Sequence, residues 1–257
     1  MADITLKTPE EIAIMRESGR LLASVFAYLD THIVAGISTM TINDLAERYI
    51  IDVLKSRPAS KGQYGYQYVL NTSVNQVVCH GMPSPTQMLK SGDIINVDIT
   101  LEKDGFIADS SKMYMIGDVM PLAKRLVDTT YEAMWAGIRT VKAGTTLGDV
   151  GHAIQSHAEQ HGYSVVREYC GHGIGREMHE QPEVLHYGRA GAGLVLEAGM
   201  TFTIEPMINQ GKAKVKTKRD GWTVVTADKK LSAQWEHTIA VTANGYEVLT
   251  LREEEFV

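Results

Sequence analysis

The chain has few cysteines and no long hydrophobic run. Cys79 and Cys170 are the two cysteines in 257 residues, too few for a disulfide framework or for a cysteine-rich zinc site. Free thiols suit a reducing compartment, so a cytoplasmic location is expected. The first residues, MADITLKTPEEI, lack the charged-then-apolar pattern of a signal peptide, and no apolar run approaches the ~18 residues of a membrane span.

Positive charge is not in excess either. The 25 Lys and Arg residues face 31 Asp and Glu residues, a net charge of −6, so neither nucleic acid nor an acidic membrane is expected as a partner. The one basic cluster, KAKVKTKR at 212–219, alternates Lys with small or apolar residues and is typical of a solvated strand or hairpin loop. With 44% hydrophobic and 22% charged residues, the composition is that of a well-cored globular protein.

Residues 62–89 contain no Asp, Glu, Lys or Arg at all. Asn, Gln, Ser, Gly and Pro interrupt the segment too often for a membrane span. Two interpretations stay open, a mostly buried loop-and-strand segment and a neutral wall over a pocket.

Helices and strands alternate along the chain. Thr8 as cap, Pro9 in the first turn and Glu11 in a capping box predict a helix start. The residues that follow at helical spacing are Ile12, Met15, Gly19, Leu22, Phe26 and Leu29. Further helices are expected over 41–56, 121–141 and 147–161. Strand-like runs occupy 93–100, 111–117, 164–169, 200–208 and 236–242.

A weak internal repeat runs through the chain. AGISTMTINDL begins at Ala35 and AGTTLGDVGHA at Ala143, an offset of 108. INVDIT (95–100) is echoed by FTIEPM (202–207), which matches Asp98 to Glu205 at an offset of 107. Two nearly equal offsets predict duplicated α/β halves related by a pseudo-twofold axis, over about 10–118 and 121–250 of a single domain, 1–257.

Two aspartates are predicted to meet across a hairpin. Asp98 lies in an apolar strand, where an ionised carboxylate is costly unless it is paired or binds metal. Asp104–Gly105 supplies a two-residue turn, so Thr100 faces Asp109 and Asp98 lies diagonally beside it, within reach of one shared ion. Taken singly, each aspartate is more typical of a structural or solvent-facing residue.

Glutamates repeat the arrangement in the second half. Glu205 and Glu236 are both flanked by apolar strand residues. Carboxylates converging from four strands repel one another unless cations neutralise them. Four carboxylates and one imidazole suit two divalent ions, and His172, between glycines that let the backbone come close, is the candidate nitrogen ligand.

Five segments in order resemble one family. INVDIT, DGFIADSSKMY, CGHGIGREMHEQP, GMTFTIEPM and SAQWEHTIAVT are together similar to methionine aminopeptidase of the bacterial type I class, over about residues 5–250. The resemblance implies the pita-bread fold, an α/β (α+β) structure with an antiparallel sheet flanked by helices and internal pseudo-twofold symmetry. It also implies removal of the N-terminal methionine from nascent proteins and peptides, with a small second residue preferred, through a metal-bridging hydroxide.

The resemblance assigns roles to the residues of the site. It implies two divalent metal ions, drawn from Mn, Fe, Co or Zn, held by Asp98, Asp109, His172, Glu205 and Glu236. Asp109 and Glu236 bridge the two ions, Asp98 holds one, and His172 with Glu205 holds the other. Glu205 is the implied general base and proton donor.

The resemblance also places residues around the substrate. His80 and His179 contact the scissile peptide and act in catalysis, and Tyr66, Trp222 and Met178 line the methionine slot. A Na or K site is implied at Asn75, Val77 and Ser232. The chain departs from the family at four pocket positions: Ser60 and Asn71 replace expected cysteines, Gln63 a tyrosine and Met178 an aromatic residue. These departures bear on the shape of the pocket and not on the metal chemistry.

Two rival functions remain at this stage. A prolidase or proline aminopeptidase shares the fold but carries an additional N-terminal domain, whereas this chain starts almost directly with the core. A metal-free pita-bread binding protein would be expected to lose ligands, and all five are present. The expected partners are the N-terminal methionine of nascent chains and the ribosome, with no DNA and no membrane, and the expected state is a monomer.

Overall fold

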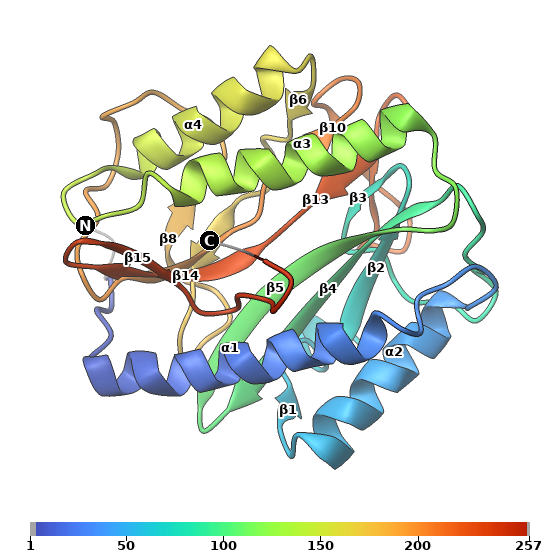
Figure 1. The fold of residues 1–257 in the computed structure, drawn as a ribbon, viewed down its shortest axis with the longest axis horizontal. Helices are drawn as coiled ribbons and strands as arrows, with labels where there is room; N and C mark the ends of the chain where they lie inside the picture. The colour runs from blue at the N-terminus through green and yellow to red at the C-terminus, as the bar shows by residue number, and fades with distance from the viewer. Residues whose placement is uncertain (1–3, 256–257) are drawn as a thin grey trace.

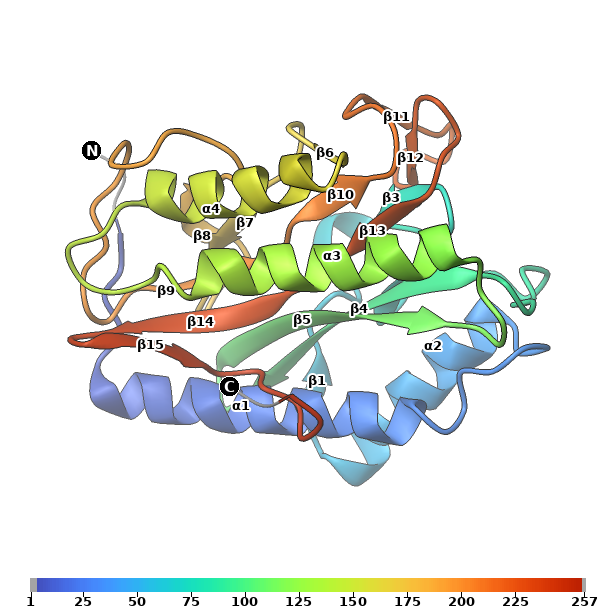
Figure 2. The same cartoon turned by 45° about the horizontal axis from the view of Figure 1, so that its top comes forward.

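The computed structural model describes residues 4–255. Strands run through the middle of the molecule, with helices along both of its halves (Figures 1 and 2). Within the described residues, none of the helices combines the length and the apolar character that crossing a bilayer requires. The α-helices are α1 (Pro9–Leu29), α2 (Thr39–Arg48), α3 (Pro121–Ile138) and α4 (Leu147–Gln160).

Helix α1 begins where its capping signals predict. The hydroxyl of Thr8 accepts the Glu11 amide N–H, and the Glu11 carboxylate accepts the Thr8 N–H. The face that carries Met15, Leu22 and Phe26 is buried. The predicted helix over 41–56 is shorter than expected as an α-helix, because α2 ends at Arg48 and continues as a π-helical turn, Tyr49–Val53.

Within residues 4–255, fifteen strands and a short 3-10 turn, Gln63–Gly65, complete the fold. The strands are β1 (Arg57–Pro58), β2 (Leu70–Val74), β3 (Val77–Cys79), β4 (Ile94–Lys103), β5 (Phe106–Met115), β6 (Ser164–Val165), β7 (Gly171–Gly173), β8 (Glu180–Val184), β9 (Thr201–Ile204), β10 (Met207–Asn209), β11 (Val215–Thr217), β12 (Val224–Thr226), β13 (Ser232–Gln234), β14 (His237–Thr242) and β15 (Gly245–Val248).

The strands pair antiparallel in four small sheets. β4 lies between β2 and β5 in the first half, and β14 and β9 lie in a five-stranded sheet, ordered β15-β14-β9-β7-β8, in the second. An isolated bridge between Ser111 and Glu236 joins β5 to the start of β14, so the two halves meet there. This antiparallel α/β architecture is the expected fold class.

Each half has its own apolar core. In the first, α1 and α2 pack on β2, β4 and β5 through residues such as Phe26, Ile42 and Ile99. In the second, α3 and α4 pack on β9 and β14 through residues such as Ile154 and Phe202. The helices therefore occupy the outer layer, and the opposite side of the strands is free to form a site.

Two predicted strands are shorter in the structure than in the sequence pattern. The run 200–208 is divided into β9 and β10, which belong to different sheets, because Pro206 has no N–H to donate to a ladder. The run 164–169 pairs only as β6, Ser164–Val165. The strand predicted over 111–117 is the end of β5, which begins at Phe106 directly after the Asp104–Gly105 turn.

Candidate active site and metal centre

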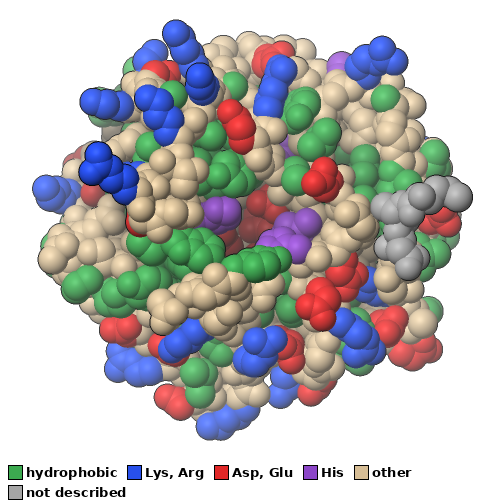
Figure 3. Space-filling view, turned by 180° about the vertical axis from the view of Figure 1, so that it is seen from behind, with side chains coloured by type: hydrophobic (Ala, Val, Ile, Leu, Met, Phe, Trp, Pro, Cys, Tyr) green, Lys and Arg blue, Asp and Glu red, His purple; other side chains and the backbone are tan. Residues whose placement is uncertain are grey.

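The face opposite to that of Figure 1 is hollowed at its centre, with histidine and acidic side chains at the bottom of the hollow (Figure 3). A cavity of about 550 Å³ opens here. All five predicted metal ligands line it, as do the predicted substrate residues His80, His179, Tyr66, Trp222 and Met178. Residues that lie up to 170 positions apart in the sequence, Tyr66 and Glu236, therefore line one cavity.

The hairpin of β4 and β5 positions the two aspartates as predicted. Thr100 pairs with Asp109 and Asp98 pairs with Ser111, so both carboxylates lie on one face of the sheet. The Asp109 amide N–H donates to the Thr238 hydroxyl (3.1 Å), and that hydroxyl donates to the Asp109 carbonyl (2.8 Å). This exchange fixes β5 against β14 at the site.

Strands β7 and β9 bring His172 beside Glu205. A Cβ on Gly171 would lie 2.4 Å from the carbonyl oxygen of Thr203, and a Cβ on Gly173 would lie 2.1 Å from the carbonyl oxygen of Gln181. Only glycine therefore lets β7 lie this close to its neighbouring strands. Nδ1 of His172 lies 3.0 Å from the Gly173 carbonyl, which places the ring proton on Nδ1 and leaves Nε2 free to ligate. That Nε2 lies 3.5 Å from Glu205 Oε1.

The fifth group, Glu236, comes from the junction of β13 and β14. It is buried, and its carbonyl accepts the Ser110 hydroxyl at 2.7 Å. One ligand atom each from Asp109, His172 and Glu236 lie within 4.8 Å of one another. The geometry therefore offers the donor atoms of a metal site from both halves of the chain.

The carboxylates strongly oppose one another's ionisation. Burial, followed by the charges of Asp98 and Glu205, raises the pKa of Asp109 well above its ordinary value. Burial raises the pKa of Asp98 to about 6 and, with the charge of Asp98 adding to it, that of Glu205 to about 8. Burial and the neighbouring carboxylates likewise raise the pKa of Glu236. Such a cluster is unfavourable unless cations compensate it.

Two further observations fit the residues to divalent ions. Oδ1 of Asp109 is buried and has no hydrogen-bond partner within the described residues, as expected for an oxygen that serves a cation. Burial also lowers the pKa of His172 to about 4, so its imidazole is neutral, the form that ligates. Oxygen donors with one nitrogen suit Mn, Fe, Co or Zn.

Two further histidines line the same cavity as the carboxylate cluster. The ring of His179 lies edge-on to that of His172, with centroids 4.4 Å apart, and the ring of the exposed Tyr64 stacks on His179 with centroids 6.0 Å apart. The ring of His80 packs edge-on against that of Tyr169, with centroids 5.6 Å apart. Burial lowers the pKa of both His80 and His179, so both rings are neutral near pH 7 and available as hydrogen-bond donors or acceptors.

The predicted methionine slot has an aromatic wall. The ring centroids of Tyr66 and Trp222 lie 4.9 Å apart, and the Tyr66 hydroxyl donates to the Leu70 carbonyl. Met178 is buried and lines the cavity. The uncharged segment 62–89 supplies the buried strands β2 and β3 and also residues that line the cavity, although fewer than half of its residues are buried.

The polar departures from the family also face the cavity. Ser60 shares a 2.6 Å hydrogen bond with Thr100. Asn71 pairs with Asp98 across β2 and β4, and its amide donates to Asp98 Oδ2 at 3.1 Å. Asn71 therefore touches a predicted metal ligand directly, so the expectation that the departures bear only on the shape of the pocket is wrong for this residue.

The predicted monovalent-cation residues lie outside the cavity. The Ser232 amide N–H donates to the Asn75 carbonyl at 2.9 Å, which brings those two residues together. Val77 begins β3 two residues further on. The Ser232 hydroxyl donates to Asn209 Oδ1 (2.8 Å), so that side chain already has a protein partner.

Several residues of the site were not predicted. Thr203 donates to Glu205 Oε1 at 2.8 Å, Gln234 donates to Glu205 Oε2 at 3.2 Å, and His186 accepts the Glu205 amide N–H at 3.1 Å. The period of two along 203–205 places Thr203 on the face of Glu205 and is the one sequence signal that could have identified it. His186 and Gln234 come from separate segments that no local pattern connects to Glu205.

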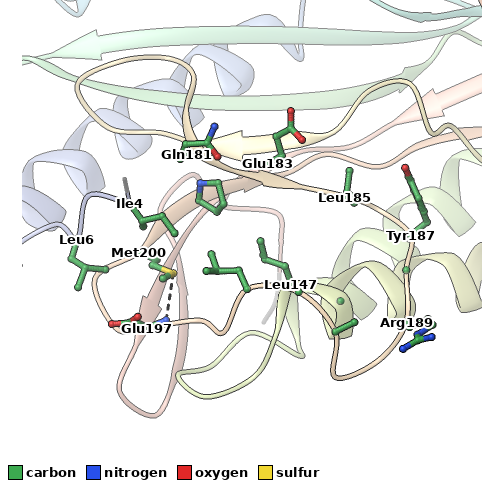
Figure 4. A pocket seen from close by; sticks show the side chains of 16 residues that line it. Ile4, Leu6, Leu147, Gln181, Glu183, Leu185, Tyr187, Arg189, Glu197 and Met200 are labelled. Carbon is green, nitrogen blue, oxygen red and sulfur yellow. Dashed lines mark hydrogen bonds between the residues drawn. The ribbon is translucent and has the colours of Figure 1, made fainter. Parts of the chain in front are cut away.

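A second cavity of about 740 Å³ lies behind β8 (Figure 4). It is lined by apolar residues such as Leu147 and Met200, with Gln181 and Glu183 on the other side of β8 from them. Although this cavity is larger, the described residues that line it form no cluster of ligating side chains, so the chemistry belongs to the smaller one.

Comparison with known proteins agrees with this site. Residues 13–243 match metallopeptidase family M24. A methionine aminopeptidase of Escherichia coli strain K12 is 48% identical over 254 residues, which cover 99% of this chain and 96% of that protein. The crystal structure of methionine aminopeptidase from Rickettsia prowazekii superposes with a TM-score of 0.95 at 48% identity, covering 97% of this chain and 100% of the other.

The rival enzyme class shares the fold at a greater distance. An Xaa-Pro dipeptidase from Bacillus anthracis superposes with a TM-score of 0.75 at 24% identity, and the match covers 98% of this chain but 63% of the dipeptidase. That likeness extends to the fold alone. The chain therefore belongs to metallopeptidase family M24 and, within it, to the methionine aminopeptidases.

Proposed function

We propose that this protein removes the N-terminal methionine from nascent proteins and peptides, with a small second residue preferred. The observation that carries the proposal is the convergence of four carboxylates, two buried and two partly buried, and one neutral imidazole on a cavity with an aromatic wall. The aromatic rings of Tyr66 and Trp222 and the thioether of Met178 suit an unbranched, polarizable side chain such as methionine.

The proposed metal ligands are those of the sequence prediction: Asp98, Asp109, His172, Glu205 and Glu236. Two divalent ions bound there would neutralise the carboxylates and lower the pKa of the attacking water from about 15.7 towards about 7. Mn, Fe, Co and Zn all suit this donor set.

Three residues are proposed to handle protons and the peptide. Glu205 is held by Thr203 and Gln234 in one orientation, which suits a general base that later returns the proton to the leaving amine. His179, whose ring lies edge-on to that of His172, would hydrogen-bond the peptide carbonyl as negative charge develops on its oxygen. His80, which also lines the cavity, would bond the scissile nitrogen.

The test uses two peptides and a chelator. The purified protein is incubated with Met-Ala-Ser and with X-Pro peptides, in each of the four metals, with and without chelator. Chelator-sensitive release of methionine from Met-Ala-Ser alone is the expected result. Cleavage of the X-Pro peptides would assign the chain to the prolidases, and binding without cleavage in every metal would make it a binding protein.

Further expectations rest on the same reading of the chain. They are a single catalytic domain, 1–257, with pseudo-repeats over about 10–118 and 121–250, a monovalent cation at Asn75, Val77 and Ser232, and a cytoplasmic monomer that meets its substrates at the ribosome. Sedimentation tests whether the protein is a monomer, and co-sedimentation with ribosomes tests whether it meets its substrates there.

A further inference from the structure

A second group of metal-ligating side chains lies on the outer helical layer, away from the cavity. Glu132 belongs to α3, His157 to the last turn of α4, and His161 is the C-cap of α4. One ligand atom from each lies within 4.8 Å of the others. None of the three lines the active-site cavity, which opens on the opposite face from α3 and α4 (Figures 1 and 3).

The two histidines have the spacing of a chelating pair. Residues four apart on a helix lie on the same face, one turn above the other. The rings of His157 and His161 accordingly lie 4.5 Å apart between centroids, with their planes inclined by 33°. Two imidazoles at this spacing are a recurrent arrangement for a transition-metal ion.

The tautomer of His161 is set for ligation. Its Nδ1 lies 2.8 Å from the carbonyl oxygen of His157, so Nδ1 carries the proton and Nε2 keeps its lone pair. A backbone carbonyl behind the ring is the usual second partner of a metal-binding histidine, because it fixes the ring orientation.

Glu132 completes the set from the neighbouring helix. Its Oε2 lies 3.2 Å from His157 Nε2, close to the roughly 3.3 Å that separates two donors of one tetrahedral ion with bonds of about 2.0–2.1 Å. Among residues 4–255, no Lys or Arg forms an ion pair with Glu132, whereas Asp128 one turn earlier is paired with Lys124. The carboxylate is therefore available to a cation.

One positive group lies beside the cluster. Nη2 of Arg125 donates to the His161 carbonyl at 3.0 Å, and the guanidinium lies 5.8 Å from the centre of the Tyr163 ring. Arg125 is thus held against the end of α4 by the backbone of His161. The charge it adds weakens a cation site without blocking it.

We propose that Glu132, His157 and His161 form a divalent transition-metal site that links α3 to α4. Two imidazoles and one carboxylate favour Zn²⁺, Ni²⁺ or Cu²⁺ over Mg²⁺ or Ca²⁺, which prefer oxygen donors. Because Glu132 is exposed, water completes the coordination. The bound ion stabilises the helical layer that supports the second half of the molecule, since a ligand that binds the folded state alone stabilises it.

The experiment uses equilibrium dialysis to measure how much zinc the full chain binds, with the free Zn²⁺ concentration equal for all proteins. His161→Ala and Glu132→Gln are compared with wild type and with His152→Ala, a histidine of the same helix outside the cluster. Each cluster variant is expected to bind one equivalent less, or to bind that equivalent at least ~10-fold more weakly. The control retains it, and methionine release is unchanged in all four proteins.

Two readouts separate this site from the metals of the active site. Ring-nitrogen NMR signals of His157 and His161 should shift on adding Zn²⁺ in wild type, and the zinc-dependent rise in Tm should be smaller in His161→Ala than in His152→Ala. Equal zinc content in all four proteins, or unmoved ring signals, would overturn the proposal. Loss of methionine release in every protein would instead contradict the proposed function and leave the zinc measurements valid.

Discussion

At Glu205, both carboxylate oxygens have protein partners before any substrate arrives. Thr203 donates to Oε1 and Gln234 to Oε2, and His186 accepts the backbone N–H. A base held from three directions needs little reorganisation when the proton moves. The orientation of this residue is therefore a property of the surrounding strands.

Glu205→Gln should lower kcat for Met-Ala-Ser by roughly 100- to 10,000-fold, because a carboxamide cannot accept the proton. The fold should persist, since the replacement keeps the volume and the Thr203 contact. Turnover and Tm are measured together, with Glu197→Gln, which lines only the second cavity, as the matched control. Near-wild-type turnover with metal bound would refute the role of Glu205.

Asn71→Ala should weaken binding of the first-row metals by about 10-fold or more, because the amide that orients the Asp98 carboxylate is lost. Titration calorimetry with Mn²⁺ or Co²⁺ measures the change. Ser60→Ala is the control from the same pocket, since the Ser60 hydroxyl bonds Thr100 and no carboxylate. Equal affinities in the two variants would show that Asn71 does not support the ligand.

Among the elements, α1 shows how closely the termini of the chain pack. A Cβ on Gly19 would lie 2.0 Å from the carbonyl oxygen of Leu249, just after β15. Helix α1 therefore lies directly on the backbone of the C-terminal segment.

Gly19→Ala tests this approach because two effects oppose one another. Helix propensity alone favours Ala over Gly by about 1 kcal/mol. The clash with a backbone carbonyl should outweigh it and destabilise the protein by about 1–3 kcal/mol. Gly245→Ala is the control, since no atom lies within 4 Å of a Cβ there. Urea unfolding of both variants gives the two free energies, and a more stable Gly19→Ala protein would refute the close approach.

Features of the elements that depend on neighbouring residues were predictable from the sequence, whereas those that depend on distant partners were not. The register of Thr100 with Asp109 followed from one local turn, and the cap of α1 from four consecutive residues, so both were predictable. The division of 200–208 into strands of two sheets depends on where Pro206 meets distant partners. The supports of Glu205 come from residues such as His186 and Gln234, which only the tertiary fold brings near.

Across the whole molecule, the site lies where the two halves of the chain meet. Asp98 and Asp109 come from the first half, and His172, Glu205 and Glu236 from the second. Behind Glu236, the fully buried Arg252 ties the C-terminal segment to the site, donating to Ser110 and pairing with Glu255. Folding thus assembles the carboxylates from separate segments, and the molecule carries their repulsion unless cations bind.

The metal-free protein should lose stability as pH rises from 7 to 8. The pKa of Glu205 is about 8 in the folded state and near 4.5 when unfolded, so in this range the folded state binds more protons, and stability falls with pH. Glu205 alone contributes about 1 kcal/mol, which is about 2–4 °C in Tm, and Asp109 and Glu236 add in the same direction. The buried histidines, with lowered pKa values, act in the opposite direction, but by only about 0.1 kcal/mol each, because their unfolded pKa near 6.5 leaves few rings protonated above pH 7.

Thermal unfolding with chelator at pH 7, 7.5 and 8 measures this slope. Saturating Co²⁺ or Mn²⁺ should abolish it, because the bound cations keep the carboxylates ionised at every pH. In metal-free Glu205→Gln, Tm should fall with pH only by the amount due to Asp109 and Glu236. The difference from wild type then gives the contribution of Glu205. A metal-free protein whose Tm is constant over this range, or rises, would mean that the carboxylates are not buried together as the structure places them.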